Sequence, residues 1–230
     1  MRRRYAAYAA GAVAAAVSAV LAAPGGTVVG NAALRHGSQV AWLKEGSVAL
    51  HPAPGSRQVS ATIDGRTEFG SRTSLPVVAA RGEWLEVIST KLHNGVGGFI
   101  RRAQVRLTRT PIAIDVDLSG RLLRVWRFGI VVLRAAVGIG AAGSPTPIGR
   151  FGITDKLTGF NPGAYGCCIL ALSAHQTHLP PGWAGGDRIA IHGGGGIGAA
   201  TSNGCLHATG AVLRRLMRRV PLGTQVVVHP

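Results

Sequence analysis

The chain has 230 residues, of which 47% are hydrophobic and 15% charged, so it can build a packed core and wholesale disorder is excluded. Lysine and arginine number 25 against 9 acidic residues, and the net charge of +16 suits an acidic partner such as nucleic acid, anionic lipid or an acidic polymer. Aromatic residues, at 5%, are few for a protein that stacks bases, and 3 cysteines are too few for a disulfide framework.

An apolar, alanine-rich run from Tyr5 to Ala23 follows an arginine triplet at the start of the chain. A basic head, an apolar centre and small residues at its end form the layout of a secretory signal. The run is also just long enough to span a bilayer of ~30 Å, so an uncleaved membrane anchor is the alternative. We therefore assign residues 1–30 to a signal peptide or membrane anchor. The rest is expected to be exported, to the periplasm or cell wall, with or without a membrane tether.

Residues 31–41 are small and polar and predict a linker, and residues 42–109 predict a small strand-rich domain. We expect strands at 47–51, 74–78, 83–88, 99–100 and 105–107, and the alternation in 84–87 places Leu85 and Val87 on one face. The stretch 73–107 resembles a bacterial Src-homology-3-like barrel, through its Leu-Pro-Val, Gly-Glu-Trp-Leu-Glu-Val and Gly-Gly-Phe-Ile strands. The resemblance implies cell-wall or peptide binding, and a spacer around a tryptophan core is the alternative.

A second region, 111–230, predicts a further mainly β domain with one or two short helices. A meander is expected over 112–137, a strand over 187–191 that ends at His192, and a closing strand over 225–228. Thr209 is expected to cap a helix over 210–220. The outer side of that helix carries Arg214, Arg215, Arg218 and Arg219. These arginines could contact phosphates, but a solvated face explains them equally well, and export argues against nucleic acid as a partner.

One cysteine and one histidine carry the chemistry of this region. Cys205 lies in the run 202–207, and His192 is 13 positions upstream. A thiol is mostly protonated near neutral pH, and a nearby imidazole can take its proton to give a thiolate–imidazolium pair. Gly204 lets backbone approach a substrate, and the amides of Gly204 and Cys205 would then hold the oxyanion of an acyl intermediate. A buried free cysteine without chemistry is the alternative.

Ordered sequence blocks place this pair in a wider pattern. They are Ser-Pro-Thr-Pro-Ile-Gly-Arg-Phe-Gly-Ile at 144–153, Ala-Tyr-Gly at 164–166, Arg-Ile-Ala-Ile-His-Gly at 188–193, Ser-Asn-Gly-Cys-Leu at 202–206 and Gly-Thr-Gln-Val-Val-Val at 223–228. In this order and spacing they resemble the L,D-transpeptidase (YkuD-type) family of bacterial cell-wall enzymes. The resemblance implies acyl transfer between peptidoglycan stem peptides, which makes a cross-link, and it implies no metal or organic cofactor.

The resemblance also assigns catalytic roles to particular residues. Cys205 matches the nucleophile that attacks the carbonyl after the third residue of a tetrapeptide stem. His192 matches the general base, which later protonates the leaving D-amino acid. Gly193 matches the position whose backbone carbonyl orients that imidazole, and Ser202 and Gly204 match the serine and glycine of the nucleophile motif.

Three further positions are assigned to substrate binding. Tyr165 matches a tyrosine near the substrate entrance. Asn203 stands where the family often has histidine, and His207 stands where it usually has arginine or asparagine. The loop between His192 and Cys205 is shorter than usual and rich in glycine, so acceptor specificity can differ.

Alternatives to a transpeptidase remain open from the sequence. An L,D-carboxypeptidase would use the same chemistry with water as acceptor, and a non-catalytic wall-binding protein would have a decayed site. A zinc site is a further alternative, because Cys167 and Cys168 precede His175 and His178. Adjacent cysteines do not form the spaced pair of a zinc ribbon, and packing of one or both in a strand is the simpler interpretation.

Overall fold

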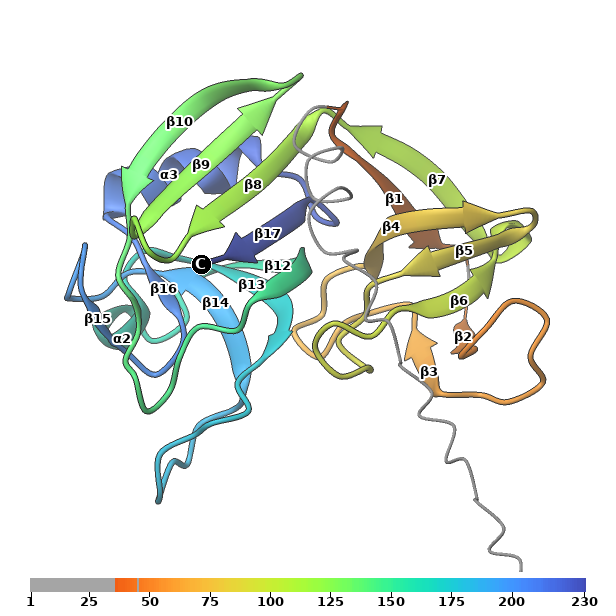
Figure 1. Cartoon of the computed structure of the whole chain (residues 1–230), viewed down its shortest axis with the longest axis horizontal. Helices are drawn as coiled ribbons and strands as arrows, with labels where there is room; N and C mark the ends of the chain where they lie inside the picture. Colours follow the sequence, from red (N-terminus) through yellow and green to blue (C-terminus); the bar gives the residue numbers. More distant parts are fainter. Residues whose placement is uncertain (1–35, 45) are drawn as a thin grey trace, which may run out of the picture.

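The computed structural model describes residues 36–44 and 46–230, so the signal peptide or anchor expected over 1–30 lies outside the described residues. Strands dominate this part of the chain and form two regions, each with its own apolar core (Figure 1). The mainly β fold expected from the sequence is confirmed. Over the described ranges, every helix is too short or too polar to cross a membrane.

The first region is built from two antiparallel sheets. Five strands pair in the order β6-β5-β4-β1-β7, and β2 pairs with β3. Their bounds are β1 Ser38–Leu43, β2 Ser47–Leu50, β3 Ala61–Asp64, β4 Ser74–Arg81, β5 Trp84–Val87, β6 Gly98–Arg101 and β7 Val105–Thr110, with a 3-10 turn η1 at Arg102–Gln104. Leu85 and Val87 are buried in the core, as their alternation predicts. Strand β1 begins at Ser38, inside the stretch 31–41 for which we expected a linker.

The second region is dominated by an eight-stranded sheet in the order β10-β9-β8-β17-β12-β13-β14-β16. The strands are β8 Ile112–Asp117, β9 Leu122–Arg127, β10 Ile130–Ala136, β12 Gly149–Thr158, β13 Cys168–His175, β14 Arg188–His192, β16 Leu206–His207 and β17 Gln225–His229. A small parallel pair, β11 (Ile139–Gly140) with β15 (Ala200–Ser202), and a short helix α2 (Pro162–Tyr165) lie beside it.

Helix α3 (Gly210–Arg219) covers one face of this sheet (Figure 1). Its predicted cap is confirmed, because the Thr209 side chain accepts a hydrogen bond from the Val212 amide. Leu213, Leu216 and Val220 are buried in the core beneath the helix, and the arginines face solvent. The amphipathic pattern therefore predicted both the helix and the face that it buries.

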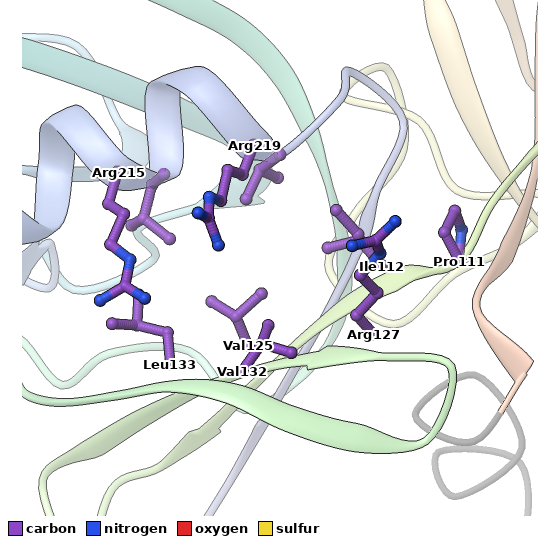
Figure 2. A pocket seen from close by; sticks show the side chains of 10 residues that line it. Pro111, Ile112, Val125, Arg127, Val132, Leu133, Arg215 and Arg219 are labelled. Atoms are coloured by element: carbon purple, nitrogen blue, oxygen red, sulfur yellow. The ribbon is translucent and has the colours of Figure 1, made fainter.

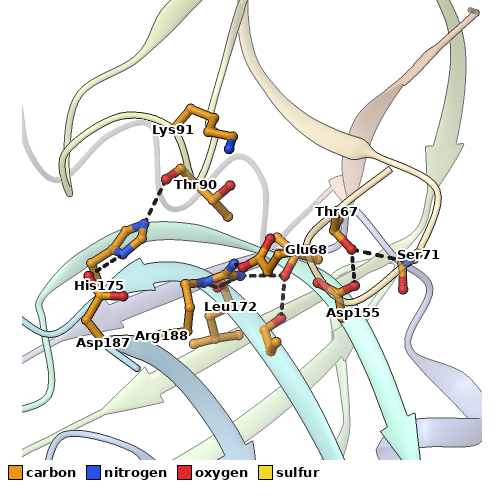
Figure 3. A network of polar contacts seen from close by, with 12 residues as sticks. Thr67, Glu68, Ser71, Thr90, Lys91, Asp155, Leu172, His175, Asp187 and Arg188 are labelled. Atoms are coloured by element: carbon orange, nitrogen blue, oxygen red, sulfur yellow. Dashed lines mark hydrogen bonds and ion pairs between the residues drawn. The ribbon is translucent and has the colours of Figure 1, made fainter. Parts of the chain in front are cut away.

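Side-chain contacts join the two regions near the start of β14 (Figure 3). Arg188 forms an ion pair with Glu68, and the Thr67 hydroxyl donates to Asp155 at 2.5 Å. His175 at the end of β13 lies between the regions, with Nε2 2.8 Å from the Thr90 carbonyl oxygen. The first region therefore touches the strand that ends at His192.

Candidate active site

Strand register brings the predicted nucleophile and base to one face of the sheet. Strands β14 and β16 are parallel neighbours, with His192 opposite His207. Ala190 precedes His192 by two positions and Cys205 precedes His207 by two, so alternation directs all four side chains to the same side. These four residues line a cavity of about 330 Å³.

The imidazole of His192 is buried and fixed in orientation, with only 5% of the residue exposed. Its Nδ1 lies 2.5 Å from the Gly193 carbonyl oxygen, and a carbonyl can only accept, so the proton is assigned to Nδ1. The other nitrogen, Nε2, is therefore left as a proton acceptor. The rings of Tyr165 and His207 pack against the imidazole, each with a centroid separation of 4.8 Å.

Burial opposes the charged forms of both His192 and Cys205. Burial lowers the pKa of His192 to about 4; the Gly193 carbonyl raises it and the charge of His207 lowers it further. Burial also raises the pKa of the Cys205 thiol, and a hydrogen bond from the Ala190 backbone acts in the opposite direction. The thiolate–imidazolium pair expected from the sequence is thus disfavoured in the resting site. The site thus favours a neutral thiol and a neutral imidazole in the same cavity.

Ser202 organises the turn that carries the predicted nucleophile, Cys205. Its hydroxyl donates to the Cys205 carbonyl at 2.6 Å and accepts from the Gly204 amide at 3.1 Å. Our expectation that the Gly204 amide holds an oxyanion is therefore corrected, because this N–H is directed at Ser202. Of the two amides proposed, the amide of Cys205 is the one that Ser202 does not engage. Gly204 has a φ of +108°, a conformation that side-chain-bearing residues rarely adopt.

Two further side chains hold the same turn, and neither of them has a role predicted from the sequence. Gln176 Nε2 donates to the Asn203 carbonyl at 3.0 Å and to the Pro145 carbonyl at 3.1 Å. The Thr146 hydroxyl donates to the Gly204 carbonyl at 2.9 Å. Side chains from other segments thus hold the two successive carbonyls before Cys205. Thr146 lies in one of the sequence blocks singled out above, whereas Gln176 carries no signal other than its position between two histidines.

The residues assigned to substrate binding are also brought together here. Tyr165, Asn203 and His207 line the same cavity as the predicted nucleophile and base. His207 Nδ1 donates to the Gly195 carbonyl at 2.7 Å, which links this histidine to the glycine-rich loop. Trp183 lines the cavity as well and is 42% exposed.

The cysteines and histidines of the zinc alternative do not converge on one site. Cys167 and Cys168 are joined to each other by a disulfide bond, and Cys168 begins β13. His175 contacts Thr90 and Asp187 instead. In the described part of the chain, no group of His, Cys, Asp and Glu is arranged to hold a metal ion.

Comparisons of the sequence with known proteins find L,D-transpeptidases. The sequence model of the YkuD family, described as the L,D-transpeptidase catalytic domain, matches residues 111–228. A putative L,D-transpeptidase YkuD from Bacillus licheniformis is 31% identical over 126 residues, which cover 52% of this chain and 67% of that protein.

Solved structures of similar proteins include two L,D-transpeptidases. One from Mycobacterium smegmatis has a TM-score of 0.41 and 18% identity, covering 66% of this chain and 69% of its own. One from Enterococcus faecium has a TM-score of 0.40 and 20% identity, covering 71% of each chain. The family match spans more than half of the sequence, and on that ground the chain belongs to the YkuD family of L,D-transpeptidase catalytic domains.

Proposed function

We propose that the protein is a peptidoglycan L,D-transpeptidase that cross-links stem peptides through a thioester on Cys205. One observation carries this proposal: His192 and Cys205 line one cavity, and the Gly193 carbonyl holds Nδ1 so that Nε2 is a free acceptor. A neutral imidazole in this tautomer is what a general base for a thiol requires. Family membership supports the same substrate class.

The reaction proceeds in two acyl transfers. In the first, Nε2 of His192 takes the thiol proton while the Cys205 sulfur attacks the carbonyl carbon after the third stem residue. The amide bond then breaks, and the leaving D-amino acid takes the proton from His192, which leaves a thioester. In the second, the amine of a neighbouring stem attacks the thioester and loses a proton to His192. That proton returns to the departing sulfur, and the enzyme is regenerated.

Intact-protein mass spectrometry with tetrapeptide muropeptides tests the proposal. We expect an acyl adduct on Cys205 after release of one D-amino acid, followed by cross-linked dimers. Cys205→Ala should form neither product. The matched control is Ser60→Ala, an exposed position in the first region that should leave both products unchanged.

The same experiment separates the alternatives. Trimmed monomers without dimers would mean that water is the acceptor, and the enzyme would be an L,D-carboxypeptidase. Retention on cell wall without adduct or turnover would mean a non-catalytic wall-binding protein. Turnover by Cys205→Ala would contradict the assignment of the nucleophile.

We also propose that residues 42–109 form a Src-homology-3-like domain next to a catalytic domain at 111–230. The strand-rich first region, with its separate core, supports this division. Export is proposed from the composition of residues 1–30, with a membrane tether if that segment is not cleaved. Fractionation of cells into cytoplasm, membrane and wall, with detection of the intact and shortened chain, tests both points.

A further inference from the structure

A second cavity, of about 450 Å³, lies between helix α3 and the hairpin of β9 and β10 (Figure 2). Strand β10 and strand β16 form opposite edges of the eight-stranded sheet, so this cleft is separate from the cavity around Cys205. Its volume is in the usual range of small-molecule sites, roughly 300–1,000 Å³. Its apolar walls are formed mainly by Ile112, Val125, Val132, Leu133, Leu216 and Val220.

Three arginines surround these apolar walls. Arg215 and Arg219 extend from α3 on one side of the cleft, and Arg127 extends from the end of β9 (Figure 2). Among the residues that the structure describes, no acidic side chain lines the cleft and none of the three arginines forms an ion pair. An apolar space with an uncompensated cationic rim is complementary to a ligand with an apolar chain and an anionic head.

A β-bulge opens one wall of the cleft. The register between β9 and β10 shifts between Val131 and Leu133, so Val132 is an extra residue with no direct partner. Bulges change the direction in which side chains point, and both Val132 and Leu133 line the cleft. Two of the six apolar residues of the cleft thus come from an irregularity in an edge strand.

The tip of the same hairpin is apolar and exposed, and its backbone conformation is unfavourable for a bulky side chain. Phe128 and Gly129 form the two-residue turn, with φ of +50° and +77°. Such turns favour Asn-Gly, and a bulky aromatic residue at positive φ is rare. Phe128 and Ile130 are 68% and 69% exposed, the highest values among large apolar side chains in the described ranges. A strained and solvent-exposed phenylalanine is understandable if the tip enters an apolar medium.

We propose that the cleft binds an acyl chain of an anionic membrane phospholipid, with the arginines on its phosphate and the hairpin tip in the interface of the bilayer. Arg127 connects the two parts, because it lines the cleft and its guanidinium lies 5.6 Å from the Phe128 ring centroid. Electrostatic attraction of arginines to anionic lipid and burial of apolar side chains together drive interfacial binding. A polyanion without an acyl chain would use the arginines but would leave the apolar walls unfilled.

The first experiment measures binding of decyl and octyl phosphate to the full chain by calorimetry, below their micelle concentrations. Decyl phosphate should bind about 15-fold more tightly than octyl phosphate, because each buried methylene favours binding. The double variant Arg215→Gln/Arg219→Gln should lose about 30-fold in affinity. The matched control, Arg214→Gln/Arg218→Gln, has the same net charge and changes the same helix outside the cleft, so it should lose less than threefold. Equal losses in the two variants, or equal affinities for the two phosphates, would overturn the proposal.

The second experiment identifies the bilayer as the source of the ligand. Vesicles of phosphatidylglycerol and phosphatidylcholine carry a photoreactive group in the acyl chain, and the labelled peptides are mapped by mass spectrometry. Residues 125–134 and 215–220 should be labelled, and Phe128→Ser/Ile130→Ser should reduce this labelling at least tenfold while decyl phosphate still binds. If vesicles leave these segments unlabelled although decyl phosphate binds, the cleft takes a free amphiphile and the membrane proposal is wrong.

Discussion

His192 ends a strand that is hydrogen-bonded on both sides, to β13 and β16, whereas Cys205 lies in a turn between the short strands β15 and β16. The base is oriented by backbone, because its Nδ1 is held by the carbonyl of Gly193. The nucleophile is oriented by side chains, because Gln176 and Thr146 hold the two carbonyls that precede it.

This difference indicates which substitutions each side of the site tolerates. On the base side, a Cβ at Gly193 would lie 2.9 Å from the Tyr165 carbonyl and from the Gly166 Cα, so only glycine fits. On the nucleophile side, hydrogen bonds from distant segments set the geometry. Apart from replacement of His192 itself, substitutions of polar side chains should therefore lower activity mainly by displacing Cys205.

Removal of the base should give the largest effect. His192→Asn retains a donor for the Gly193 carbonyl but lacks the Nε2 acceptor, so the rate of Cys205 acylation should fall about 10³-fold. Intact-mass kinetics measure this rate. His178→Asn, an exposed histidine in the neighbouring loop, is the control and should change the rate less than twofold. A fall of less than tenfold for His192→Asn would mean that another group takes the thiol proton.

Loss of the Gln176 amide should give the next largest effect. Gln176→Leu leaves the Asn203 and Pro145 carbonyls without their donor, and displacement of a reacting atom by ~1 Å costs about 10²-fold in rate. We expect kcat to fall about 10²-fold with KM unchanged, measured at a temperature where the variant is fully folded.

The exposed neighbour Thr177 provides the control, and Thr177→Val should leave kcat unchanged. A Gln176→Leu variant with lowered Tm but normal kcat would show that Gln176 stabilises the fold without positioning the nucleophile.

The sequence predicted the base side of the site better than the nucleophile side. Alternation and the strand end located His192, and the motif located Cys205, because both signals are local in the chain. The hydrogen bond from Gln176 to the Asn203 carbonyl joins residues 27 positions apart, and no local pattern in the sequence predicts such a contact. The sequence indicates strand β13 only weakly, through the interpretation that its cysteine packs in a strand. The residues of this strand are buried almost throughout and therefore show no alternation of apolar and polar side chains.

The pH dependence of kcat/KM should report the lowered pKa of the buried His192 imidazole. Because burial lowers the pKa of His192 to about 4, kcat/KM should change less than twofold between pH 7 and 5 and fall about tenfold per unit below 4. An exposed histidine would give the same fall below pH 6.5 instead. A profile that breaks near 6.5 would contradict a desolvated base.

The free energy of unfolding should depend on the protonation of the same imidazole. Between pH 6.5 and 4 the unfolded chain binds a proton at His192 that the folded chain does not, so stability is lost as the pH falls. The loss at full protonation is about 3 kcal/mol, measurable by urea unfolding at several pH values. His192→Asn should abolish this part of the pH dependence, and an unchanged dependence would assign it to other groups.

The contact between the two regions should give the smallest effect. Glu68→Gln removes the ion pair with Arg188 on β14, but the Glu68 side chain is 47% exposed and such pairs contribute at most ~1 kcal/mol. Arg188 is four residues from His192 along a strand paired on both sides, so acylation should change less than twofold. Glu83→Gln breaks an exposed pair with Arg101 inside the first region and is the matched control. A tenfold loss of acylation for Glu68→Gln alone would mean that the first region positions the base, and that backbone pairing does not suffice on that side of the site.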